Sequence, residues 1–254
     1  MTDHFIDGGP WIRRFHPEPG AAIRLVCFPH AGGAASFFFP VSRDMSPEVE
    51  VLSVQYPGRQ DRRADPNIPD MEKMADQVAE ALTPFTDRPF ALFGHSMGAT
   101  LAYEVTRRLR ASNRHAMALF VSGRRAPHRV IDDGLHLLPN DMLVDDVMAL
   151  EGTGGHILDN PELRDMLLAA IRSDYRAAET YRYVPGPPLR CPIHALTGLS
   201  DPRVAAGELH HWGEHTEGAF DIQVFSGGHF YLTENQPAVI QVIAERLSRA
   251  TTSR

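Results

Sequence analysis

The chain has 254 residues, of which 43% are apolar and 22% are charged, so it can bury one large core and shows no compositional bias toward disorder. Its formal net charge of −7 argues against broad binding to nucleic acids or anionic membranes, which attract positively charged surfaces.

Six short apolar runs alternate with helical stretches along the chain. They are Ile23–Phe28, Val49–Gln55, Phe90–Phe93, Ala116–Ser122, Cys191–Thr197 and Phe220–Phe225. Strands that alternate with helices predict a mostly parallel sheet with both faces covered. Because ligands bind beyond the carboxyl ends of such strands, the residues after each run are the candidate site.

A glycine-rich loop and three chemically reactive side chains follow four of these runs. The loop is His30–Gly33, and the side chains are Ser96, Asp201 and His229. Their order along the chain, serine then acid then histidine, is the order of the triad in α/β-hydrolases.

The segment Gly94-His95-Ser96-Met97-Gly98 stands between an apolar run and a helical pattern. This G-x-S-x-G arrangement is typical of the nucleophile elbow, in which a serine occupies a strained turn between a strand and a helix. The residues two before and two after the serine must be small so that strand and helix can approach closely. Glycine occupies both places.

Each candidate has a chemical role. A serine hydroxyl is a poor nucleophile at neutral pH, so Ser96 needs a base to take its proton, and we assign His229 to that role. A carboxylate must fix the tautomer of the imidazole, and we assign Asp201. The backbone N–H groups of Met97 and Ala31 are the predicted oxyanion hole.

Other residues of the same types fit these roles less well. His30 and His95 stand beside the loop and the serine, not at a later strand end. Asp221 begins a strand, and the aspartates between residues 129 and 184 belong to the insertion described in the next paragraph.

A helical insertion is expected between the fourth and fifth runs. Residues 140–150 and 161–181 carry apolar side chains at helical spacing, and Gly152–Gly155 predicts a flexible joint between them. We therefore expect an α/β-hydrolase core of residues 1–128 and 185–254, with residues 129–184 as a helical lid. A lid excludes water and offers an apolar wall to an acyl chain.

Export and metal-binding signals are weak. The first 15 residues contain no unbroken apolar stretch and no later run could cross a bilayer, so we expect a cytoplasmic protein. Cys27 and Cys191 are then expected to be reduced and buried.

His211 and His215 lie one helical turn apart without the glutamate of a zincin motif, so we predict no metal.

The motifs together resemble one family, the stand-alone (type II) thioesterases of polyketide synthases and non-ribosomal peptide synthetases. The matching stretches are Phe28–Gly33, Tyr56–Arg59, Phe93–Ala99, Thr197–Asp201 and Gly227–Phe230. The resemblance implies hydrolysis of acyl groups from the phosphopantetheine arm of a carrier protein. It implies no cofactor of the enzyme's own, because the substrate protein carries the phosphopantetheine, and we expect a monomer.

Basic residues after two strands suggest where a carrier protein would dock. Such carriers are generally acidic, and Arg59, Arg62, Arg63, Arg124 and Arg125 are expected on the active-site face. A solvated basic rim without a partner is an equally good interpretation.

Three other functions share these residues. The first is a hydrolase of other substrates, either a carboxylesterase or a thioesterase of fatty-acid synthesis that acts on medium-chain acyl-carrier or acyl-CoA. The second is a cyclising or acyl-transferring relative. A non-catalytic module that binds carrier proteins is the third, although such a module would be expected to have lost a triad residue.

Overall fold

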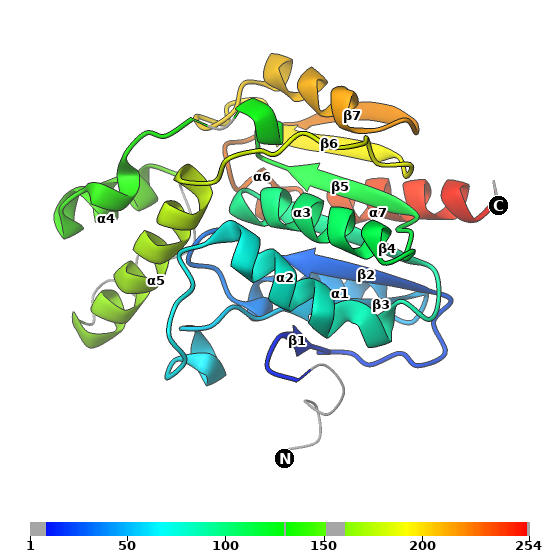
Figure 1. Ribbon diagram of the computed structural model, residues 1–254, viewed down its shortest axis with the longest axis horizontal. Coiled ribbons are helices and arrows are strands. Elements are labelled where there is room, and N and C mark those ends of the chain that lie inside the picture. The colour runs from blue at the N-terminus through cyan, green and yellow to red at the C-terminus, as the bar shows by residue number, and fades with distance from the viewer. Residues whose placement is uncertain (1–8, 130, 151–160, 253–254) are drawn as a thin grey trace.

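The computed structural model describes residues 9–129, 131–150 and 161–252, and its centre is a seven-stranded sheet in the order β1-β3-β2-β4-β5-β6-β7 (Figure 1). The strands are β1 Ile12–Arg13, β2 Ile23–Phe28, β3 Val49–Val54, β4 Phe90–His95, β5 Ala118–Ser122, β6 Ile193–Gly198 and β7 Phe220–Phe225. Every neighbouring pair is parallel except β1 with β3. The expected α/β class with a mostly parallel sheet is confirmed.

The apolar runs predict six of these strands, and the prediction is wrong in omitting β1. This edge strand has two residues and pairs antiparallel with β3, where Ile12 lies opposite Val54. Two residues cannot show a period. Strand β4 also extends through His95, which pairs with Ser122 of β5, because backbone pairing continues past the last apolar residue.

Helices cover both faces of the sheet (Figure 1). They are α2 Met71–Leu82 and α3 Met97–Ala111 on one face, and α1 Phe39–Met45 and α7 Gln236–Thr252 on the other. Successive strand residues alternate between these two cores, as Leu25 and Val26 do. Two buried faces explain why the strands appear as continuous apolar runs.

The segment between β5 and β6 contains α4 (Asn140–Ala149) and α5 (Pro161–Glu179), which lie beyond the end of the sheet (Figure 1). Both helices occur within two residues of the expected ranges. The predicted joint at Gly152–Gly155 lies outside the described residues. Short helical segments complete the described chain: η1 Ala35–Phe38, η2 Gln60–Arg62, η3 Thr83–Phe85, η4 Pro127–Arg129, η5 Leu135–Leu137, η7 Ala206–His215 and α6 Tyr231–Glu234.

Both cysteines, Cys27 and Cys191, are buried and unpaired, as expected. None of the helices within the described residues combines the length and the apolar character needed to cross a membrane.

The junction of β4 and α3 leaves no room for a side chain at two positions. A Cβ atom on Gly94 would lie 2.1 Å from the carbonyl oxygen of Gly98, and one on Gly98 would lie 2.2 Å from that of Phe28. The neighbouring atoms are backbone, so they cannot rotate away. Glycine is therefore required at both positions for α3 to cross β2 and β4 this closely.

We predict that Gly98→Ala lowers the free energy of unfolding by about 1–3 kcal/mol or more, because the added methyl group forces the backbone of α3 away from β2. Urea denaturation followed by circular dichroism measures the loss. Gly207→Ala is the matched control, since nothing lies within 4 Å of a Cβ atom there. Equal stability of the two variants would contradict the requirement for glycine.

Candidate active site

Ser96 occupies the corner between β4 and α3 in a backbone conformation that serine rarely adopts, with φ 55° and ψ −122°. Its N–H donates to the carbonyl of Ser122 at 2.8 Å, which ties the corner to β5. The side chain is half-buried and lines a cavity of about 660 Å³. Strain of this kind, held in place by its surroundings, is typical of a nucleophile elbow.

Asp201 and His229 form a buried hydrogen-bonded pair at the ends of adjacent strands. Asp201 follows β6 and His229 follows β7. The Nδ1 atom of His229 lies 2.9 Å and 3.0 Å from the two carboxylate oxygens of Asp201, and neither side chain is more than 1% exposed. Because the carboxylate accepts from Nδ1, the neutral ring keeps its lone pair on Nε2.

The serine and the histidine lie at the same cavity. Ser96 and His229 both line it, together with the glycine-rich loop that follows β2. The ring of His229 lies 4.9 Å from that of His95, the residue next to the serine. The three predicted triad residues are therefore gathered at one edge of the sheet.

Two further histidines nearby lack the acidic partner of His229. Burial, reinforced by the neighbouring His229, lowers the pKa of His30 to about 3 and lowers that of His95 well below its usual value. His95 Nδ1 bonds instead to the hydroxyl of Ser122 at 2.9 Å. Within the described residues, neither ring is bonded to a carboxylate, so neither is oriented as a base.

The glycine-rich loop has two N–H groups that are already engaged. Gly32 donates to the carboxylate of Asp174 at 2.7 Å, and Gly33 donates to the carbonyl of His30 at 3.0 Å. The N–H of Ala31 belongs to the same loop, and Met97 begins α3, where backbone N–H groups have no partner within the helix. Ala31 and Met97 therefore remain the candidate donors to a bound oxyanion.

Helix α5 forms an apolar wall of the cavity and is anchored to the loop by one buried carboxylate. Asp174, 1% exposed, accepts from the N–H of Gly32 and from the guanidinium of Arg59. Ile171 packs so closely on Gly32 that a Cβ atom there would lie 2.4 Å from it. The wall residues are Val147 of α4 and Met166, Leu167, Ala170, Ile171 and Tyr175 of α5.

Sequence reasoning missed Asp174. A signal was present, because an acid stands at helical spacing from Ile171 on the apolar face of this helix. Its partner Arg59 lies far away in the chain, so the spacing of residues along the helix could not show that the two form an ion pair.

The five arginines that we expected on the active-site face differ in exposure. Arg59 lines the cavity, as expected, but its side chain is buried. Arg62 is also buried and stacks on the indole ring of Trp11 at 4.5 Å, so neither guanidinium is exposed for a partner to contact. Arg124 and Arg125 are partly buried and bond to neighbouring residues of this chain. Arg63 is exposed and lies at the cavity.

Comparison with known proteins adds an independent observation. A family model described as a thioesterase domain matches residues 23–247. The chain is 46% identical over 253 residues to the thioesterase PikA5 of Streptomyces venezuelae, covering 97% of this chain and 89% of that protein. It is 35% identical over 239 residues to the gramicidin S biosynthesis protein GrsT of Aneurinibacillus migulanus, covering 93% of each.

A solved structure is also similar. The type II thioesterase BorB from the borrelidin biosynthetic cluster superposes with a TM-score of 0.89 at 49% identity, covering 94% of this chain and 98% of that chain.

We predict that Asp174→Ala costs about 3–5 kcal/mol of unfolding free energy, because it leaves the guanidinium of Arg59 buried without a counter-charge. The double variant Asp174→Leu with Arg59→Met should recover most of that loss, since an apolar pair replaces an ion pair. Both values come from urea denaturation.

The control is Asp44→Ala, which breaks the exposed ion pair with Arg43 and should change stability little. If Asp174→Ala were no more destabilising than this control, the buried pair would not anchor α5.

Proposed function

Because this chain belongs to the thioesterase family, we propose that it hydrolyses acyl thioesters through Ser96, His229 and Asp201. The α/β-hydrolase fold expected from the sequence is confirmed by the sheet and by the matches to thioesterases. The observation that best supports the proposed mechanism is the buried Asp201–His229 pair at the cavity that the strained Ser96 also lines.

In this mechanism the hydroxyl of Ser96 attacks the thioester carbonyl carbon while Nε2 of His229 accepts its proton. Asp201 holds the ring and stabilises the imidazolium. The N–H groups of Met97 and Ala31 donate to the oxyanion of the tetrahedral intermediate. The thiol then leaves, and since thiols have a pKa near 8.5 it needs less help from His229 than an amine would. Water, activated by His229, releases the free acid from the acyl-serine.

The proposed substrates are acyl or peptidyl groups on the phosphopantetheine arm of carrier proteins, cleared from a polyketide synthase or a non-ribosomal peptide synthetase. Two findings support this choice. The similar proteins include a type II thioesterase of a biosynthetic cluster and a gramicidin S biosynthesis protein. The apolar wall of α5 suits a carbon chain attached to the reacting carbonyl.

The proposed core and lid correspond to separate ranges of the chain. We propose that the described residues within 1–128 and 185–254 form the hydrolase core and that those within 129–184 form a lid. We propose that the enzyme needs no cofactor of its own for this reaction. We also propose that it works as a cytoplasmic monomer whose protein partner is the carrier protein.

We predict that Ser96→Ala abolishes hydrolysis and that Asp201→Asn lowers kcat by about 10³–10⁴-fold, because the ring of His229 would adopt the wrong tautomer. Mass spectrometry of acyl-loaded carrier proteins before and after incubation measures both. Ser112→Ala, at an exposed serine, is the control. Full activity of Ser96→Ala would contradict the mechanism.

The same assay, extended to acyl-CoA and simple esters, separates the alternatives. Faster turnover of acyl-carrier than of both small substrates supports the proposed function. Equal or faster turnover of simple esters would favour a carboxylesterase, and preference for acyl-CoA would favour an enzyme of fatty-acid metabolism.

We predict that Arg63→Glu raises KM for acyl-carrier several-fold at low salt, because an acidic carrier would meet a negative charge at the cavity mouth. The effect should shrink as salt screens the charges. Steady-state kinetics at two ionic strengths measure it, with a small neutral thioester as the comparison substrate. An unchanged KM for the carrier would contradict docking at Arg63.

A further inference from the structure

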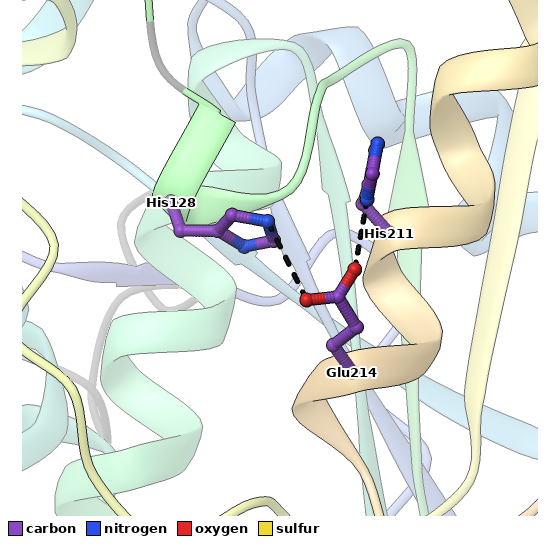
Figure 2. A group of neighbouring side chains, drawn as sticks. All are labelled: His128, His211 and Glu214. Carbon is purple, nitrogen blue, oxygen red and sulfur yellow. Dashed lines mark hydrogen bonds and ion pairs between the residues drawn. The ribbon is translucent and has the colours of Figure 1, made fainter.

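Three side chains with metal-ligating atoms meet outside the cavity, where η4 and η7 lie next to each other. His128 comes from η4, and His211 and Glu214 come from η7 (Figure 2). One ligand atom of each lies within 4.8 Å of the other two. The cluster therefore joins two segments that are far apart in the sequence.

The carboxylate of Glu214 lies between the two imidazoles, with one oxygen facing each ring (Figure 2). His211 Nδ1 is 2.8 Å from Oε1, and His128 Nε2 is 3.7 Å from Oε2. A tetrahedral Zn²⁺ ion with bonds of about 2.0–2.1 Å holds its ligand atoms roughly 3.3 Å apart. These two histidine–carboxylate distances bracket that spacing, and all three ligand atoms lie within 4.8 Å of one another, so rotation of the side chains would bring them around one ion.

A third histidine, His215, contacts the ring of His128 on the side away from Glu214. Nε2 of the buried His215 lies 2.7 Å from Nδ1 of His128, and its Nδ1 lies 3.1 Å from the hydroxyl of Tyr103.

This support sets the tautomer that a metal needs. When Nε2 of His215 accepts a hydrogen bond from the Nδ1–H group of His128, the lone pair of His128 lies on Nε2, on the side of Glu214. Histidines that bind metals usually donate their other N–H group to a partner of this kind.

We propose that His128, His211 and Glu214 bind one Zn²⁺ ion, with the fourth coordination position open to water. Two imidazoles and one carboxylate suit zinc, whereas Mg²⁺ and Ca²⁺ prefer oxygen ligands alone. The bound ion links η4, where the chain leaves β5 toward α4, to η7 of the core. This proposal revises the sequence-based prediction of no metal, which weighed His211 and His215 without the distant His128.

A second group of possible ligands, Asp132, His136 and Glu179, is a weaker candidate. The carboxylate of Glu179 already accepts from the N–H groups of Leu135 and His136, at 2.9 Å and 3.0 Å. Its oxygens are engaged in holding η5 against α5, so a metal would have to break those bonds.

The test is zinc binding by the full-length protein, without an affinity tag and stripped with a chelator. Calorimetric titration with ZnCl₂ should give one ion per chain. At a tenfold excess of free Zn²⁺ over Kd, the melting temperature should rise by about 3–6 °C, while MgCl₂ produces no rise. His128→Ala and His211→Ala should each weaken binding by at least about tenfold.

His115→Ala is the matched control, because this exposed histidine is bonded to Asn113 outside the cluster and should leave zinc binding unchanged. Two results would overturn the proposal. One is the absence of zinc uptake by the unaltered protein, and the other is unchanged affinity in the double variant His128→Ala with His211→Ala, which would place the ion elsewhere.

Discussion

The close approach of α3 to β4 is the constraint from which the site is built. With no space for a side chain at Gly94 or Gly98, the chain reverses direction within one residue, and Ser96 takes up the strained conformation. That corner projects the serine beyond the end of the central strand. The neighbouring strands β6 and β7 end at the same edge, which is why an aspartate and a histidine from distant parts of the chain can meet there.

Electrostatics then distinguishes the histidines around the cavity. Burial keeps His30 and His95 uncharged, so they pack as aromatic rings around the site. His229 is as deeply buried but has the carboxylate of Asp201, which can stabilise a positive charge on it. Helix α5 contributes the cavity wall, and its Asp174 holds both the glycine-rich loop and Arg59. The position of the wall and the shape of the loop thus depend on one carboxylate.

Much of the fold, and the grouping of the candidate side chains, follows from local sequence. The grouping of Ser96, Asp201 and His229 could be predicted because each follows a recognisable strand. Helices α4 and α5 could be predicted because their apolar residues repeat at helical spacing. Strand β1 was missed because two residues carry no pattern. The burial of Arg59 and Arg62 could not be predicted, since it depends on contacts with an acid of α5 and with an indole ring. The cluster of His128, His211 and Glu214 could not be predicted for the same reason, since its members come together only in the folded chain.

The proposed reaction requires the acyl group to pass through the hydroxyl of Ser96. The most direct measurement is intact-protein and peptide mass spectrometry of enzyme quenched with acid during turnover of an acyl-loaded carrier protein. If Ser96 carries the acyl group, the peptide that contains Ser96 gains the mass of that group and loses it again as free acid forms. Acyl transfer to a different residue, or release of the acid with no covalent intermediate under any quenching condition, would contradict it.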